Sequence, residues 1–180
     1  MKKTIITILL ALVSLASCSS DPQWADEEAH EKTEQLRKQY TPIIAGTWHV
    51  EYIKDKGRFF ERLTFSADGT FTGMRKWQTR KLVTIDGEQR YTDWEDVELS
   101  GTFKGTWQLR YWSPEGNSGE KRNCLQLTAT YDDEERDYMA YSSALTFAYA
   151  DATTLRIQGY YVKAPDGWIN YQRGPSEPNF

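Results

Sequence analysis

The chain has 180 residues, with 22 basic and 26 acidic side chains and a formal net charge of −4. Its length suits one domain, and the acidic balance argues against a basic nucleic-acid-binding surface. Only two histidines are present, and we find no histidine cluster for zinc, no credible Ser-His-Asp set and no phosphate or dinucleotide loop. Carboxylate pairs for glycosidic cleavage stay open, because their separation depends on the fold. We expect no enzyme, no cofactor, no metal and no nucleic-acid partner.

The first 18 residues have the order of a secretory leader. Lys2 and Lys3 precede an apolar run from residue 5 to residue 15, which is too short to span a bilayer as a helix. The run ends in Leu15-Ala16-Ser17-Cys18, which resembles the lipobox of bacterial lipoproteins. This resemblance implies removal of residues 1–17 and acylation of Cys18, whose acyl chains would hold the protein on the membrane. The alternative is an ordinary secreted protein with a chance cysteine at its cleavage site.

Cleavage before Cys18 would change the charge and the thiol content of the chain. It removes two basic residues and no acidic one, so the net charge goes from −4 to −6. Cys124 remains as the one unmodified thiol, which excludes an intramolecular disulfide and predicts a buried, apolar cysteine. We expect an outer-membrane lipoprotein of a Gram-negative envelope. Acidic residues soon after Cys18 resemble surface-export signals, and both the periplasmic and the surface side remain open.

Residues 18–42 are predicted to form a partly helical tether. The segment is rich in charge, and Ser20 or Asp21 can cap a helix start. Its large apolar residues are too few for a deep apolar stripe (Trp24, Leu36 and Tyr40). We therefore expect a stalk that lifts a domain of residues 43–180 off the membrane.

From residue 43 onward the apolar residues recur with a period of two, as in strands with one buried face. The alternation is clear near residues 48–52, 103–111, 125–131 and 153–163. Asp-Gly pairs at Asp68-Gly69, Asp86-Gly87 and Asp166-Gly167 suit the tight turns of hairpins. The pattern predicts an all-β fold, with eight or nine antiparallel strands in an up-and-down meander that can close into a barrel.

The opening of this domain resembles the lipocalin family. Gly46-Thr47-Trp48 is similar to the lipocalin Gly-x-Trp signature, and residues 63–71 are similar to a hairpin of bacterial lipocalin-like lipoproteins. The resemblance implies a barrel floor closed by Trp48, with an arginine of the last strand over it. Arg156 or Arg173 can fill this position, and Arg156 is our candidate. The second lipocalin signature has no convincing counterpart, because residues 91–94 lie within a strand-like run.

The chain is also rich in aromatic residues, with 7 Trp, 11 Tyr and 7 Phe. We expect most of them in the core, since sheets favour aromatic packing across strands. Four rings face away from the predicted core and are the candidate ligand-binding residues (Trp94, Trp112, Tyr160 and Trp168). Two hypotheses follow. The first is binding of a small apolar or amphipathic ligand in the barrel mouth, and the second is an accessory module that holds a glycan or a protein partner with exposed rings.

Overall fold

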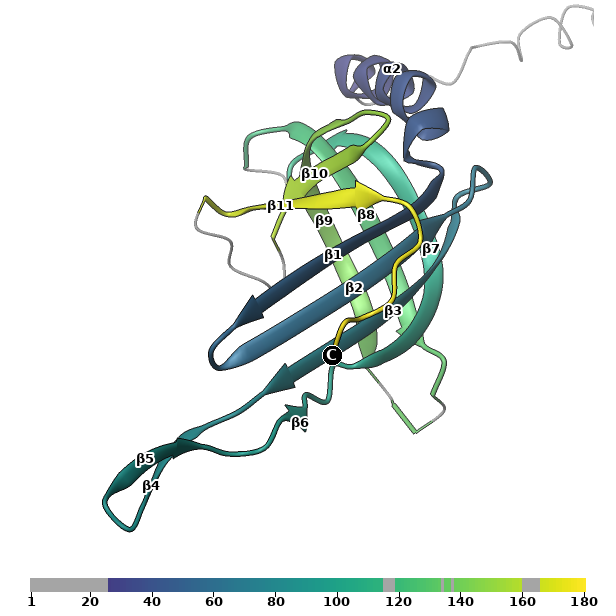
Figure 1. The fold of residues 1–180 in the computed structure, drawn as a ribbon. Helices are drawn as coiled ribbons and strands as arrows, with labels where there is room; N and C mark the ends of the chain where they lie inside the picture. Colours follow the sequence, from purple (N-terminus) through teal and green to yellow (C-terminus); the bar gives the residue numbers. More distant parts are fainter. Residues whose placement is uncertain (1–25, 115–118, 134, 137, 160–165) are drawn as a thin grey trace, which may run out of the picture.

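The structure is a computed structural model that describes residues 26–114, 119–133, 135–136, 138–159 and 166–180. Helix α2 (Glu27–Ile44) comes first in these residues, and the strands follow it along the chain (Figure 1). The strands are β1 (Gly46–Lys54), β2 (Gly57–Phe65), β3 (Thr70–Thr79), β4 (Leu82–Ile85), β5 (Glu88–Tyr91), β6 (Glu95–Asp96), β7 (Gly101–Trp112), β8 (Arg122–Tyr131), β9 (Met139–Ala150), β10 (Thr154–Gln158) and β11 (Trp168–Arg173).

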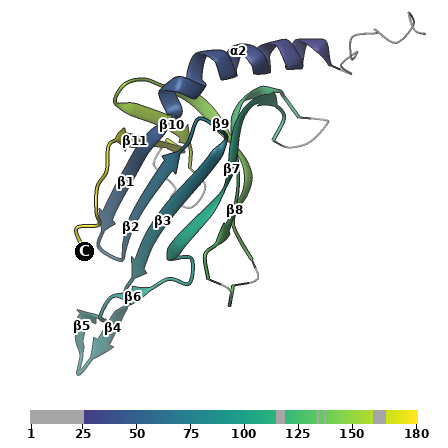
Figure 2. The ribbon, with the colours of Figure 1, turned by 90° about the vertical axis from the view of Figure 1, so that its right-hand side faces the viewer.

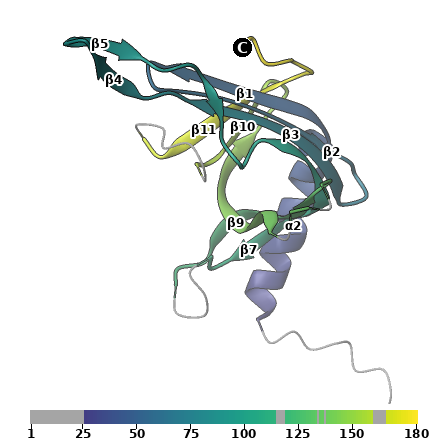
Figure 3. The same ribbon diagram turned by 90° about the horizontal axis from the view of Figure 1, so that it is seen from below.

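Eight antiparallel strands close into a barrel, as the sequence predicts. The order around the barrel is β1, β2, β3, β7, β8, β9, β10 and β11, and each strand pairs with the one before it. Pairing of β11 with β1, with Trp48 opposite Arg173, completes the ring (Figure 3). The up-and-down prediction is therefore confirmed, and closure removes the sheet edges that an open meander would expose.

Tight turns at the predicted Asp-Gly pairs join neighbouring strands. At the β2–β3 turn, Gly69 has a φ of 88° and the Asp68 carboxylate accepts a hydrogen bond from the Thr70 amide at 2.9 Å. At the β4–β5 turn, Asp86 and Gly87 both have positive φ, as a two-residue hairpin requires. The third pair, Asp166-Gly167, directly precedes β11. The turn at Asp68-Gly69 thus sets the register of the β2–β3 pair in the barrel wall, whereas the β4–β5 turn lies outside the barrel.

The barrel interior is filled with large side chains. Buried rings come from most of the barrel strands (Trp48, Phe59, Phe65, Phe71, Phe103, Trp107, Tyr131, Tyr141, Phe147 and Tyr171). Gly73 lets the Phe103 ring lie directly on β3, because a Cβ at this glycine would be 2.2 Å from the ring. Cys124 is buried, as expected. An eight-stranded barrel is just wide enough for side chains to fill it, and here they do so.

Helix α2 packs against one end of the barrel (Figure 2). Leu36, Tyr40, Ile43 and Ile44 follow the i, i+4, i+7, i+8 spacing of one helix face, and Leu36 and Ile44 are buried in the core. The predicted stalk therefore needs correction from residue 27 onward. The apolar stripe continues past residue 42, where we expected the tether to end, and this continuation ties the helix to the barrel. The predicted caps Ser20 and Asp21 lie outside the described residues, and Asp26 caps α2.

A hairpin of β4 and β5 projects from the opposite end of the barrel (Figure 1). Most of its side chains are exposed. Its base is held by Arg80, whose guanidinium lies 4.1 Å from the ring centroid of Tyr91 and 4.4 Å from that of Trp94. The side chain of Arg80 also donates to the carbonyl of Asp55 at 2.6 Å. The hairpin is thus an arm fixed at its base rather than part of the barrel wall.

Candidate functional site

The barrel floor has the arrangement that the lipocalin resemblance implies, with Arg173 in the arginine position. Trp48 is fully buried, and its indole N–H donates to the carbonyl of Ile44 at 2.7 Å. The Arg173 guanidinium lies 4.8 Å from the centroid of the Trp48 ring and donates to the Ile43 and Ala45 carbonyls. Our candidate Arg156 lies elsewhere.

Strand register and side-chain alternation explain the choice between the two arginines. Arg173 lies directly opposite Trp48 in the β1–β11 pair. Arg156 lies on β10, where it pairs with Asp166 at 2.9 Å and stacks on Trp168. Arg156 lies between the buried Leu155 and Ile157, so its side chain points out of the barrel. Gly46 is required beside Arg173, because its φ is 132° and a Cβ there would be 2.8 Å from the guanidinium.

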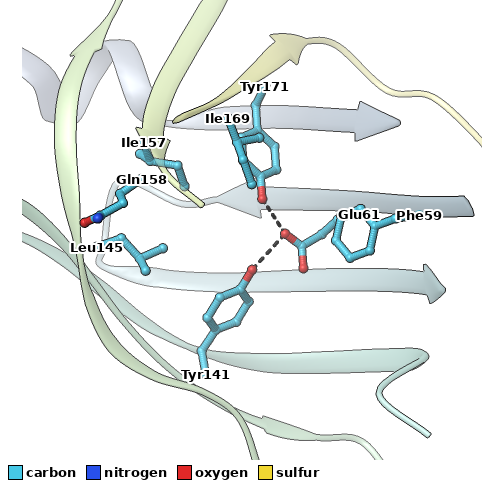
Figure 4. Close-up of a pocket in the computed structure, with 8 residues that line it drawn as sticks. All are labelled: Phe59, Glu61, Tyr141, Leu145, Ile157, Gln158, Ile169 and Tyr171. Atoms are coloured by element: carbon cyan, nitrogen blue, oxygen red, sulfur yellow. Dashed lines mark hydrogen bonds between the residues drawn. The ribbon is translucent and has the colours of Figure 1, made fainter. Parts of the chain in front are cut away.

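The barrel interior contains a buried ion pair between Glu61 of β2 and Arg75 of β3. Their side chains have 0% and 1% relative exposure, respectively. Arg75 contacts one carboxylate oxygen of Glu61 through Nε at 2.8 Å and through Nη2 at 2.7 Å. The hydroxyls of Tyr141 and Tyr171 donate to the other oxygen at 2.7 and 2.5 Å (Figure 4). Each charge therefore has the partners that burial demands.

The two tyrosines stay protonated at neutral pH. Burial raises the pKa of Tyr141 and of Tyr171 well above the usual value of 10, and the nearby Glu61 carboxylate raises both further. A protonated hydroxyl is what allows each tyrosine to donate to Glu61. Arg75 Nη1 also donates to the Tyr131 hydroxyl at 3.2 Å, and that hydroxyl donates to the Leu99 carbonyl at 2.8 Å. The buried network thus links β2, β3, β8, β9 and β11.

A small cavity lies beside this network, toward Leu145, Ile157 and Ile169 (Figure 4). Its volume is about 10 Å³, which is room for about one water molecule. Sites for small organic ligands have volumes of roughly 300–1,000 Å³. This cavity is therefore far smaller than the pocket that we expected in the barrel mouth, and the rings of Phe59, Tyr141 and Tyr171 line it.

The candidate ligand-binding rings do not form one site. Trp94 precedes β6 at the end of the barrel away from α2, and the guanidiniums of Arg58 and Arg80 lie 4.3 and 4.4 Å from its ring centroid. Trp168 begins β11, also at the end away from Trp48, and is partly covered by an arginine. Trp112 ends β7 on the α2 side, and Tyr160 lies outside the described residues.

Trp112 lines a groove between α2 and the outer face of β7. The groove has a volume of about 760 Å³, and Trp112 is 39% exposed within it. One face of the helix, with residues at i, i+3 or i+4 spacing, forms one wall of the groove. The end of β7 forms the other wall. The lining residues are Asp26, Ala29, His30, Thr33, Glu34, Arg37, Gln108, Arg110, Tyr111 and Trp112.

Hydrogen bonds between helix and strand hold this groove in shape. The Tyr111 amide donates to the Thr33 hydroxyl at 3.0 Å. Arg37 donates to the carbonyl of Leu109 at 3.2 Å and to the side chain of Gln108 at 3.0 Å. The Arg110 guanidinium lies 4.3 Å from the centroid of the Trp112 ring. The groove thus combines an exposed aromatic face with charged and hydroxyl groups.

Sequence reasoning missed the Glu61–Arg75 pair and the groove. A signal for the pair was present, since Glu61 is in phase with the inward residues Phe59 and Leu63 along β2. A charge in phase with apolar side chains indicates a buried charge that needs a partner. The groove had no comparable signal, because it depends on how α2 lies against β7.

No protein-family model, curated protein or solved structure matches the chain. Among the described residues, no helix is long and apolar enough to cross a membrane. The same part of the chain has no group of three or more His, Cys, Asp or Glu side chains placed to hold a metal ion.

Proposed function

We propose that this chain is a non-enzymatic lipoprotein of the bacterial envelope that binds a small amphipathic ligand outside its barrel. In this proposal residues 1–17 are removed and Cys18 carries the acyl chains that hold the protein on the outer membrane, on its periplasmic or its surface side. The barrel is a rigid scaffold, and the ligand lies in the groove between α2 and β7.

The contrast between two volumes carries the proposal. The interior cavity has about 10 Å³, whereas the groove has about 760 Å³. The groove falls within the range of small-molecule sites, and the cavity is far below it. Refilling the interior with a ligand would require displacement of several buried rings, each of which contributes about 1.5–3 kcal/mol of burial.

The groove chemistry favours an amphipathic ligand over a purely apolar one. Ala29, Tyr111 and the exposed Trp112 ring offer apolar contact. Arg110 places a cation at the same site, whereas Arg37 is paired with Glu34. An aromatic face beside a guanidinium suits a molecule with an apolar body and an anionic or polar group. The glycan hypothesis has less support, since Trp94 and Trp168 lie away from Trp112 and the rings do not form one stacking surface.

Titration with 1-anilinonaphthalene-8-sulfonate, an amphipathic fluorescent anion, tests the site. We expect Ala29→Trp to fill the groove and abolish binding, and Trp112→Ala to weaken binding about tenfold, or about 1.4 kcal/mol. Tyr91→Ala is the matched control, because Tyr91 is also an exposed ring beneath an arginine but lies on the β4–β5 arm. Unchanged binding by Ala29→Trp would overturn the proposed site.

Metabolic labelling tests the anchor separately. Cells that express the full chain are grown with labelled palmitate, and the protein is recovered from the membrane fraction. We expect label in the wild-type protein and none in Cys18→Ser. A wild-type protein that is secreted without label would contradict the lipoprotein assignment and favour the ordinary secreted form.

A further inference from the structure

The start of α2 lies close to the proposed anchor in sequence. Seven residues, 19–25, separate Cys18 from Asp26. A chain spans at most about 3.3–3.6 Å per residue, so the two Cα atoms are at most about 29 Å apart. A lipidated Cys18 therefore limits the distance between the membrane surface and the first turn of α2.

Asp26 is itself fixed to the barrel. Its carboxylate accepts a hydrogen bond from the Ala29 amide at 3.0 Å and pairs with the side chain of Lys121, which directly precedes β8. The hydrogen bond from Lys121 is the main cause that lowers the pKa of Asp26. The short link thus leads from the anchor to the β7–β8 end of the barrel.

The exposed side chains at this end suit a membrane interface. Trp112 lines the same groove as Asp26, and the Arg110 guanidinium lies over its ring. Tryptophan is enriched where membrane and water meet, because its ring is apolar and its N–H is polar. Arginine beside it can reach lipid phosphate groups.

The charged side chains at this end of the barrel indicate which lipid surface it would contact. The nearby acidic groups Asp26, Glu28 and Glu34 are paired with Lys121, Lys32 and Arg37, respectively. This end of the barrel therefore lacks the excess of cations that attracts anionic lipids. Aromatic contact with a zwitterionic surface fits this balance better.

We infer that the edge formed by Trp112, Arg110 and the start of α2 docks on a zwitterionic lipid surface beside the acylated Cys18. This inference rests on the proposed lipidation. A short link gives the edge an effective concentration in the millimolar range at the membrane, so a weak contact is enough. The groove then opens beside the lipid surface, where it can take an amphipathic ligand directly from the membrane.

Quenching of tryptophan fluorescence by brominated lipid tests the docking. The mature protein, with Cys18 acylated, is reconstituted into phosphatidylcholine vesicles that contain brominated phosphatidylcholine. All samples carry Trp24→Phe, so that the tryptophan between Cys18 and Asp26 does not contribute. We expect quenching that is lost in Trp112→Phe and retained in Trp168→Phe, because Trp168 lies at the far end of the barrel. Urea unfolding midpoints confirm that both variants are folded.

The outcomes separate this inference from the lipoprotein proposal. Palmitate label on Cys18 without quenching that depends on Trp112 overturns the docking and leaves the lipoprotein proposal intact. Absence of label overturns both. Stronger quenching in anionic phosphatidylglycerol vesicles than in phosphatidylcholine overturns the assignment of a zwitterionic surface.

Discussion

Removal of Arg75 tests whether the ion pair inside the barrel is as completely buried and paired as its geometry indicates. In Arg75→Met, the Glu61 carboxylate stays buried with two tyrosine donors but without its cation. Loss of one partner from a buried pair costs about 3–5 kcal/mol. Typical domains have about 5–15 kcal/mol of total stability, so the variant should lie near the limit of folding.

Urea unfolding, with linear extrapolation of the unfolding free energy to water, measures this loss. A variant that replaces Glu61 with Leu, Arg75 with Met, and Tyr141 and Tyr171 with Phe should recover most of it, because apolar groups then take the place of the ion pair and of the two hydroxyls on Glu61. The Tyr131 hydroxyl keeps its hydrogen bond to the Leu99 carbonyl at 2.8 Å. Lys104→Met, which breaks an exposed pair, is the control and should change little. A loss below about 1 kcal/mol in Arg75→Met would show that water reaches the pair.

Three further perturbations address the core, the strand packing and the floor. Above pH 10 the unfolded chain releases the protons of Tyr141 and Tyr171, while the folded protein keeps them. The unfolding free energy should therefore fall by up to about 1.4 kcal/mol per pH unit for each tyrosine. Urea titrations from pH 9 to 11 measure this fall. Gly105→Ala should cost about 1–3 kcal/mol or more, since its Cβ would lie 1.9 Å from a neighbouring carbonyl oxygen, whereas Gly57→Ala should be tolerated in the same assay. Arg173→Ala should lower stability by about 2–3 kcal/mol through loss of charged hydrogen bonds, and an unchanged melting temperature would contradict its role in the floor.

The alternation of side chains was enough to predict the antiparallel strands, and the lipocalin resemblance added the prediction of a barrel. Phe103, Trp107 and Leu109 alternate with polar residues in the sequence and are buried in the structure. The turn at Asp68-Gly69 likewise has the predicted hairpin. These features follow from local rules, because strand period and turn conformation depend on neighbouring residues.

Features that depend on contacts between distant segments were harder to predict. Leu36 and Ile44 belong to one helix face, but only the packed helix shows that this face covers the barrel end. Strand register places Arg173 opposite Trp48. Arg156, by contrast, lies between the buried Leu155 and Ile157, so the alternation along β10 already turns it out of the barrel. The filling of the interior also depends on how rings from different strands interdigitate.

The candidate binding rings show the same limit. Trp112 was singled out for facing away from the core, and it does line a groove. Trp94 was chosen on the same ground, yet it lies at the other end of the barrel from this groove. Exposure of a ring follows from side-chain alternation, whereas its neighbours depend on the tertiary fold.

Amide chemical-shift mapping with 1-anilinonaphthalene-8-sulfonate tests most directly whether the ligand lies outside the barrel. Spectra of the ¹⁵N-labelled protein are recorded during titration with the probe. If the ligand occupies the α2–β7 groove, the largest shifts will fall on Ala29, Thr33 and Trp112. Largest shifts on Glu61 and Leu145, with little change along α2, would place the ligand inside the barrel and contradict the external site.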